Sequence, residues 1–351
     1  MINVGIIGAG AVVRRGHLPA LKDMKEINVK AIADIDENLA KNVAREFQIP
    51  SFCSEPLKII KDPSIDLIDI CTPSDTHCEL IKLAAQEGKN ILVEKPLTTT
   101  IEDALQAYHA VVEAGVKLNV VQNWRYFPAV FQVKERINQG YLGKIVGMEG
   151  VALTNFPTAW TRSKWLYSQG GVLFDFAPHL IDLMIWLNGS EVKAVYALGG
   201  DITGGNMGFV NHAQVIMEFD NGATATAIIS WVTESFTFTV DVYGTGGNIT
   251  LDVRNAHYYE MHGAQTPLDD IRRVIGKTLR VTKDILNKNY FKGAMLYYKP
   301  LIRDFIKSIK ENREEPVPIR HGVMVTAVLD GAFRSLRKRQ AIYLDNIFDI
   351  A

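Results

Sequence analysis

Short apolar runs alternate with amphipathic stretches along the first 125 residues of the chain. The runs are nearly continuous in Val, Ile and Leu, which is typical of parallel strands buried on both faces, and the stretches between them have helical spacing. This alternation predicts a doubly wound parallel sheet. We expect strands over 3–7, 28–34, 67–72, 90–95 and 117–122, with helices near 14–24, 36–46, 76–88 and 101–114.

The pattern changes after a further helix near 127–139. Longer strand patterns follow, and tight turns such as Asp220-Asn221-Gly222 supply the positive φ angles that hairpins need. We therefore expect a second domain of the α+β class with a large, mostly antiparallel sheet, and place the domains at 1–122 and 123–351. The strands are expected over 144–155, 192–200, 212–220, 223–234, 236–243 and 247–253, and the helices over 175–188, 266–312 and 320–337.

The size and composition of the chain agree with two domains, since 351 residues exceed what a single core usually serves. A formal net charge of -1 gives no overall field that attracts nucleic acid or an anionic membrane, so neither is an expected partner. No apolar run is long enough to span a bilayer. Three cysteines form no CxxC motif and no signal-peptide pattern is visible, so we expect reduced thiols and a cytoplasmic location.

The sequence VGIIGAGAVV contains a candidate nucleotide-binding loop. Gly8 and Gly10 follow the first strand, where Gly8 permits a tight turn and Gly10 lets a pyrophosphate approach the helix N-terminus. Ala11 and Val12 complete the loop. Val13 occupies the third fingerprint position, where Gly or Ala is usual, so we expect helix and strand to pack slightly further apart. The alternative is a doubly wound domain that binds no nucleotide.

Residues at the carboxyl ends of the other strands extend this candidate site, because ligands of doubly wound sheets bind there. Asp34 ends the second strand, where a carboxylate accepts hydrogen bonds from the adenosine ribose and repels a 2′-phosphate. Ile35 follows instead of a basic residue, which favours NAD over NADP. The alternative is that Asp34 is only a helix N-cap. Further cofactor contacts are predicted at Thr72, Pro73, His77, Glu94, Lys95 and Asn123.

Lys95 ends the predicted strand 90–95 and precedes Pro96. A lysine in that position faces the crevice beside the nicotinamide and can give or take a proton. The alternative is a surface lysine paired with Glu94.

A second group of titratable residues lies in GGVLFDFAPHLID, residues 170–182. Asp175 and His179 are four residues apart, so in a helix they share one face and can line one pocket. Two structural alternatives remain: Asp175 interacting with the helix dipole, and His179 as a satisfied buried histidine. A metal site would need a third ligand at workable spacing, and none stands near, so no metal is expected.

The segments GIIGAG, AIAD, TPSDTH, EKPL, NWRYFP and GGVLFDFAPHLID, in this order, resemble the Gfo/Idh/MocA family of NAD(P)-dependent oxidoreductases. The resemblance implies an N-terminal Rossmann domain and a C-terminal α+β domain whose sheet forms homodimer or homotetramer contacts. Family members mostly oxidise or reduce a secondary alcohol on a sugar, nucleotide-sugar or cyclitol. By position, Lys95, Asp175 and His179 match the family's catalytic residues. Ala177 and Pro178 depart from its usual D-x-G-x-H pattern without removing a reacting group.

These residues give a hypothesis for the chemistry of a dehydrogenase that uses NAD. His179 is the base that takes the hydroxyl proton, because histidine titrates near neutrality; Asp175 is its partner, and Lys95 stabilises the developing alkoxide. Substrate contacts are predicted at Lys95, Arg125, Trp160, Arg162, Lys164, Asp175 and His179. Trp160, Arg162 and Lys164 suit a sugar that carries a phosphate, a nucleotide or a carboxylate, although a solvated basic loop has the same composition.

Two other functions stay open: an NAD-dependent glycosidase that acts through transient oxidation, and a non-catalytic NAD-binding regulator. Residues 271–293 form a basic segment with an apolar stripe. We expect a helix that covers its own sheet with Lys and Arg outward. The alternative is a surface for a polyanionic substrate, a partner or an anionic membrane.

Overall fold

The computed structural model describes residues 1–156, 170–205, 207–253, 257–261, 263, 266–286, 293–344 and 347–348. The chain divides into two compact units: Met1–Asn123 with Ala294–Thr326, and Trp124–Gly293 with Ala327–Ala351. Residues 294–326 thus belong to the first unit, whereas the sequence prediction placed them in the second domain. Within the described part of the chain, no helix combines the length and apolar character needed to cross a membrane.

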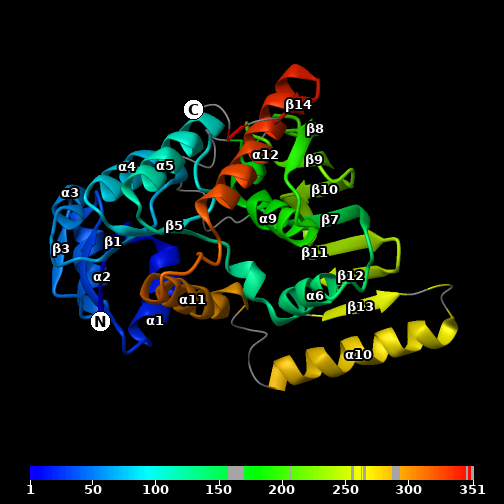
Figure 1. Ribbon diagram of the computed structural model, residues 1–351, viewed down its shortest axis with the longest axis horizontal. Coiled ribbons are helices and arrows are strands. Elements are labelled where there is room, and N and C mark those ends of the chain that lie inside the picture. The colour runs from blue at the N-terminus through cyan, green and yellow to red at the C-terminus, as the bar shows by residue number, and fades with distance from the viewer. Residues whose placement is uncertain are drawn as a thin grey trace. The chain divides into compact units, whose positions relative to one another are not determined.

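The first unit contains a parallel sheet (Figure 1) whose described strands run in the order β3-β2-β1-β4-β5-β6. The order reverses between β1 and β4, which is where doubly wound sheets bind their ligands. The predicted doubly wound sheet is confirmed. The short β3 was not predicted, because only three residues form it and it contains no apolar run. The strands are β1 (Ile2–Ile7), β2 (Ile27–Ala33), β3 (Ser51–Cys53), β4 (Leu67–Ile70), β5 (Asn90–Glu94) and β6 (Leu118–Val121).

The predicted helices of the first unit are present, but the first opens with a π-helical turn, η1, instead of an α-helical one, and the short α3 was not predicted. A π turn holds more residues than an α turn, so it changes which of the following side chains face inward. The elements are η1 (Val13–His17), α1 (Leu18–Lys22), α2 (Glu37–Glu46), α3 (Pro56–Ile60), η2 (Ser74–Thr76), α4 (His77–Gln86) and α5 (Ile101–Ala114).

Helix α11 (Tyr298–Glu311), which follows η5 (Gly293–Tyr297), explains why residues 294–326 belong to the first unit. Its apolar residues Leu301, Ile302, Phe305 and Ile306 are all buried and recur at helical spacing, so they form one face. The helix packs against η1, α1 and β6. Because this face is buried against the first unit, residues 294–326 belong to that unit although they follow the strands of the second unit along the chain. The next helix, α12 (Ile319–Lys338), begins in the first unit and ends in the second.

The second unit contains a sheet with the described strand order β13-β12-β11-β7-β10-β9-β8-β14. All neighbours are antiparallel except β7 and β10, so the predicted mostly antiparallel sheet is confirmed. The predicted strands 223–234 and 236–243 instead meet at Trp231, whose N–H donates to the Asn211 carbonyl. The strands are β7 (Ile145–Asn155), β8 (Val192–Gly200), β9 (His212–Phe219), β10 (Thr224–Ser230), β11 (Val232–Gly244), β12 (Asn248–Asp252), β13 (His257–Met261) and β14 (Ile342–Tyr343).

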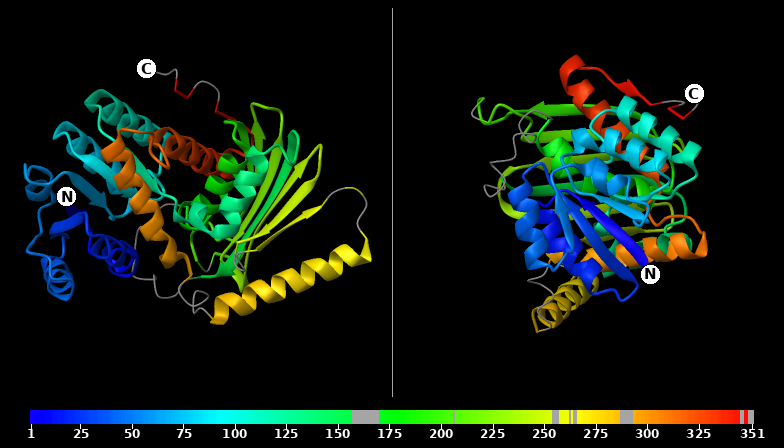
Figure 2. Two further views of the ribbon diagram at one scale, coloured as in Figure 1. Left: turned by 60° about the horizontal axis from the view of Figure 1, so that its bottom comes forward. Right: turned by 90° about the vertical axis from the view of Figure 1, so that its left-hand side faces the viewer.

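Helix α9 (Ala177–Asn188) covers β7 and β10, and α6 (Pro128–Asn138) lies on the same face of the sheet over β12 and β13 (Figure 2). Gly150 in β7 lets α9 approach closely, since a Cβ atom there would lie 2.7 Å from the Met184 sulfur and 2.8 Å from Leu180. Residues 271–286 of the basic segment belong to α10 (Pro267–Leu286), which contacts β13, and residues 287–292 lie outside the described residues. Leu279 and Leu286 of its apolar stripe are exposed, so the expected burial of that stripe against the sheet is wrong for these residues.

Candidate active site

The loop between β1 and η1 has the geometry that its glycines predict. Gly8 has a φ angle of 103°, and a Cβ atom there would lie 2.5 Å from the Cys71 carbonyl oxygen, so only glycine fits. At Gly10 a Cβ atom would meet nothing within 4 Å, which leaves the backbone open to a ligand. Ala11 is exposed and Val12 half-buried, so the loop presents its backbone on the surface of the unit.

Asp34 holds this loop in place. Its Oδ2 accepts a hydrogen bond of 2.8 Å from the Ala9 N–H, and its Oδ1 accepts one of 2.9 Å from the Asp36 N–H. The N-cap of α2 is Asp36 rather than Asp34, because the Asp36 carboxylate accepts from the first-turn N–H groups. The alternative that Asp34 is only a helix N-cap is therefore wrong. Each carboxylate oxygen has a second lone pair, and the half-buried side chain leaves room for a hydroxyl donor. Ile35 is 92% exposed.

The turn after β4 contains Thr72 and the exposed Pro73, and is tied to the turn after β5 by the buried His77. One ring nitrogen of His77 lies 2.9 Å from the Thr72 carbonyl, and the other lies 3.1 Å from the carbonyls of Pro96 and Leu97. Burial lowers the pKa of His77, although the three carbonyls oppose this shift. Since both ring nitrogens face backbone carbonyls, His77 braces the two turns.

Two buried polar atoms at the carboxyl edge of this sheet were not singled out from the sequence. Within the described residues, the Ser74 hydroxyl and the Gln122 side-chain oxygen have no hydrogen-bond partner. Ser74 opens η2 after β4, and Gln122 follows β6 and precedes the buried Asn123. Buried polar groups normally have partners, so these atoms fit a ligand rich in hydroxyl and amide groups, such as a dinucleotide. The available signal was the position of Gln122 directly after a strand and of Ser74 in the turn after β4.

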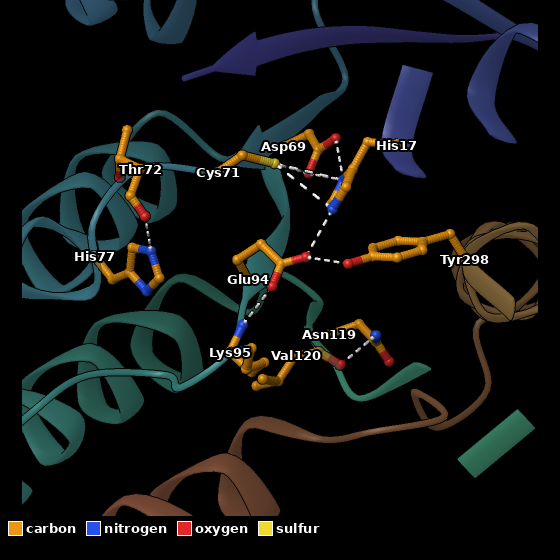
Figure 3. A network of polar contacts seen from close by, with 10 residues as sticks. All are labelled: His17, Asp69, Cys71, Thr72, His77, Glu94, Lys95, Asn119, Val120 and Tyr298. Carbon is orange, nitrogen blue, oxygen red and sulfur yellow. Dashed lines mark hydrogen bonds and ion pairs between the residues drawn. The ribbon is translucent and has the colours of Figure 1, made fainter. Parts of the chain in front are cut away.

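Lys95 follows β5 and is half-buried (Figure 3). Its N–H donates to Oε2 of Glu94 over 3.1 Å, and its peptide bond to Pro96 is cis. Glu94 is only 7% exposed, and its Oε1 accepts hydrogen bonds from His17 and Tyr298. Glu94 is therefore not the surface residue that the alternative of a surface pair with Lys95 requires.

In the second unit, Asp175 and His179 belong to two short consecutive helices rather than one. Asp175 ends α8 (Val172–Asp175), Phe176 links the two, and Pro178 lies in the first turn of α9, where proline is tolerated. Gly171 precedes α8 with a φ angle of 56°, and a Cβ atom there would lie 2.2 Å from the Val210 carbonyl oxygen. Asp175 is 7% exposed.

The ring of His179 stacks on Trp124, which belongs to η3 (Asn123–Tyr126), with centroids 4.7 Å apart and planes inclined by 18°. Trp124 is itself buried against Phe127 and Phe238. The stacked indole restricts how the imidazole can rotate, which gives His179 a defined orientation.

Arg125 is engaged within the second unit. Its Nε and Nη2 donate to the two carboxylate oxygens of Asp182 over 2.9 and 2.7 Å, and the side chains are 5% and 1% exposed. The guanidinium also lies 5.0 Å from the Trp186 ring centre. This geometry favours a structural role over the predicted substrate contact. The other predicted substrate contacts, Trp160, Arg162 and Lys164, lie outside the described residues.

Comparison with known proteins decides the family. Residues 2–122 match the oxidoreductase family with an NAD-binding Rossmann fold, and residues 130–250 match the GFO/IDH/MocA C-terminal domain. The chain belongs to the Gfo/Idh/MocA family. The resemblance stated from the sequence is thus confirmed, and so are the predictions of an enzyme, an NAD(P)-dependent dehydrogenase, and of NAD as its cofactor.

Individual members of the family show how far the similarity extends. Scyllo-inositol 2-dehydrogenase (NAD+) of Bacillus subtilis is 32% identical over 231 residues, which cover 64% of this chain and 67% of the relative. Levoglucosan dehydrogenase of Pseudarthrobacter phenanthrenivorans is 30% identical, with 72% and 73% covered. The WlbA dehydrogenase from Bordetella pertussis, solved with NADH and UDP-GlcNAcA, superposes with a TM-score of 0.82 at 23% identity over 98% of this chain and 97% of that one.

Proposed function

We propose that this enzyme transfers a hydride between NAD and a secondary hydroxyl or ketone of a sugar, nucleotide-sugar or cyclitol. The observation that carries the proposal is a half-buried lysine at the carboxyl end of β5, at the same edge of the sheet as the open Gly-rich loop that follows β1. Relatives at 30% identity or more are named for inositol and levoglucosan, which are rings that bear secondary hydroxyls.

The residues of the first unit fit NAD. The open backbone at Gly10 suits the pyrophosphate, and the remaining lone pairs of Asp34 suit the ribose hydroxyls. Ser74 and Gln122 offer buried polar atoms that lack partners within the described residues, and these suit the nicotinamide half. When bound, NAD supplies the hydride acceptor. The remaining cofactor contacts are proposed at Gly8, Ala11, Val12, Ile35, Thr72, Pro73, His77, Glu94, Lys95 and Asn123.

The side chains manage the proton that remains when a hydride leaves an alcohol. We assign the base to His179, whose ring is oriented by Trp124, with Asp175 as its partner, and the alkoxide-stabilising charge to Lys95. This assignment requires residues of the two units to act on one substrate. Arg125 is assigned to Asp182 instead of the substrate. Trp160, Arg162 and Lys164 remain the proposed contacts for a phosphate, nucleotide or carboxylate on the sugar.

Assembly and location are also proposals. We propose a homodimer or homotetramer formed through the C-terminal sheet, on which half-exposed apolar residues such as Leu198 and Ile216 stand. A cytoplasmic location is supported by the free thiols of Cys53, Cys71 and Cys78.

The test is a substrate panel. The purified enzyme is incubated with NAD+, or with NADP+, and with myo-inositol, scyllo-inositol, levoglucosan, glucose or UDP-glucose in turn, and the absorbance of reduced cofactor is followed. We expect reduction of NAD+ with at least one cyclic polyol. Tight NADH binding without turnover of any of them would contradict the proposal and favour a regulator. Release of p-nitrophenol from a nitrophenyl glycoside without accumulation of NADH would favour the glycosidase.

A further inference from the structure

A buried histidine outside the proposed catalytic set lies between two carboxylates in the first unit (Figure 3). His17, the last residue of η1, is 0% exposed. Its Nδ1 lies 2.9 Å from Oδ2 of Asp69 in β4, and its Nε2 lies 2.9 Å from Oε1 of Glu94 in β5. A neutral imidazole has one N–H, and each of these contacts needs a donor. The two contacts together fit the doubly protonated, positively charged ring, which donates to both carboxylates.

The groups that face His17 support this protonation state. Burial alone would lower the pKa of His17, but Asp69 and Cys71 outweigh it and raise that pKa well above its ordinary value. Burial likewise would raise the pKa of Glu94, and the His17 contact overrides it and lowers that pKa. The remaining neighbour from a packed element is Tyr298, whose pKa burial and Glu94 raise, so it stays a neutral donor.

Tyr298, the first residue of α11, contacts both Glu94 and His17. The Tyr298 hydroxyl donates to Oε1 of Glu94 over 3.2 Å, and its ring lies 4.9 Å from the His17 ring. Gly16 makes this approach possible, since a Cβ atom there would lie 2.9 Å from the Tyr298 ring. The elements β4, β5 and α11 thus each place a side chain against the ring of His17 in η1.

Glu94 connects the cluster to Lys95. While Oε1 is held by His17 and Tyr298, Oε2 accepts the N–H of Lys95. The backbone from which the lysine side chain projects is therefore fixed through a carboxylate that His17 orients. On the other side of the same turn, His77 holds the carbonyls of Pro96 and Leu97.

We propose that His17 is a positioning residue for Lys95, acting through the carboxylate of Glu94. The inference rests on the proposed role of Lys95 in the reaction. In this proposal the helix that follows the Gly-rich loop also holds the position of the lysine at the end of β5. A charged hydrogen bond is stronger than a neutral one, so a cation between Asp69 and Glu94 holds that geometry better than a neutral side chain.

A metal ion is the competing explanation, because ligand atoms of His17, Asp69 and Cys71 lie within 4.8 Å of one another. A metal would have to displace the proton that Nδ1 shares with Asp69. Burial and the neighbouring carboxylate of Asp69 also raise the pKa of the Cys71 thiol, which opposes the thiolate that a metal needs. The observed contacts account for each of the three side chains without an ion.

Hydrogen exchange tests the link from His17 through Glu94 to the backbone N–H of Lys95, and it needs no substrate. In His17→Gln we expect the amide of Lys95 to exchange at least about tenfold faster than in the wild type, measured by mass spectrometry of peptides that contain it. The matched control is Lys89→Met. Lys89 precedes the opposite end of β5, is 7% exposed, and donates to the carbonyls of Asp62 and Ile65. That variant should leave exchange at Lys95 unchanged. Unchanged exchange in His17→Gln would overturn the proposal.

Turnover separates a positioning role from a merely structural one. With the polyol turned over fastest in the panel, His17→Gln should lower kcat at least about tenfold and leave the Kd of NADH within about twofold, because small misplacement of a reacting group lowers the rate strongly. In a Lys95→Met background the same change should have no further effect on residual kcat. Equal losses in the two backgrounds would contradict the inference. Wild-type turnover in Lys95→Met would instead contradict the proposed function.

A second variant covers the case in which His17→Gln does not fold. Combining it with Asp69→Asn removes the cation and one carboxylate together, which leaves one buried carboxylate without its cation, Glu94, instead of two. We expect the double variant to fold and to recover part of the kcat lost in His17→Gln. A double variant with wild-type kcat would show that the charge on His17 is unnecessary and would overturn its positioning role.

Discussion

The two units each bury an ion pair near a proposed catalytic residue, and the two pairs differ in chemistry. In the first unit, the cation is His17, which bridges Asp69 and Glu94. In the second, it is Arg125, which makes a two-pronged contact with Asp182. A guanidinium stays charged at all pH values at which proteins fold, whereas an imidazolium does not. The cation of the buried pair in the second unit therefore keeps its charge as the pH changes, whereas the cation of the buried pair in the first unit can lose its charge.

The largest expected effect tests whether the two units contribute to one reaction. His179→Ala and Lys95→Ala should each lower kcat by a factor of about 1,000 or more, since proton transfer and charge stabilisation each supply factors of that order. The Kd of NADH, measured by fluorescence, should stay within a few-fold. If only one of the two substitutions affects turnover, the chemistry lies in one unit.

The next effect concerns stability. Arg125→Met leaves the Asp182 carboxylate, which is 1% exposed, without its guanidinium. Removing one partner of a buried pair typically lowers the free energy of unfolding by about 3–5 kcal/mol. Urea unfolding measures this loss. The exposed pair Arg14–Glu46 is the control, and Arg14→Gln there should change stability by less than about 1 kcal/mol. Similar losses in the two variants would contradict the assignment of Arg125 as a brace.

A pH titration distinguishes the two buried pairs directly. Because the pKa of His17 is raised in the folded state, its stabilisation is complete below the unfolded value of 6.5 and is lost as pH rises toward the folded value. As the pH rises above about 6.5 toward the folded-state pKa, the free energy of unfolding of the wild type should fall by about 1.4 kcal/mol per pH unit relative to His17→Gln. Arg125→Met should keep the wild-type slope. Parallel curves for the wild type and His17→Gln would show that His17 is neutral in the folded protein.

The smallest expected effect concerns Asp34, a half-buried carboxylate that holds a loop as the two buried pairs hold their units. Asp34 holds the Ala9 amide but also has lone pairs open to a ligand, so its substitution should change binding more than folding. In Asp34→Asn the negative charge is lost, and we expect the preference for NAD+ over NADP+ in kcat/KM to fall about tenfold. An unchanged preference would remove Asp34 from the cofactor site.

The parts of the site that the sequence predicts are those in which one residue directly follows a strand. Gly8, Asp34 and Lys95 each stand at the carboxyl end of a parallel strand, and that position alone places them at one edge of the sheet. Gln122 has the same signal, and Ser74 lies in the turn after β4, but neither was singled out. The sheets followed from apolar periodicity, except for β3 and β13, which were not predicted.

The rest depends on contacts between distant positions. His17 lies inside the predicted helix 14–24, and its partners are 52 and 77 residues away along the chain. Nothing in the local pattern distinguishes an inward histidine from an outward one, and the π turn that sets its direction has no sequence signature. The ion pair between Arg125 and Asp182 could not be predicted for the same reason, because Asp182 lies 57 residues away along the chain.

The contact between Tyr298 and Glu94 joins residues 204 positions apart. A nascent chain that has just passed β6 already contains every strand of the parallel sheet, but it lacks the phenol that covers Gly16 and completes the bonding of Glu94. The first unit therefore reaches its final form only after residues 124–293 have left the ribosome. Synthesis and folding of the two units are interleaved, and a chain truncated before residue 298 would leave the surroundings of Lys95 unfinished.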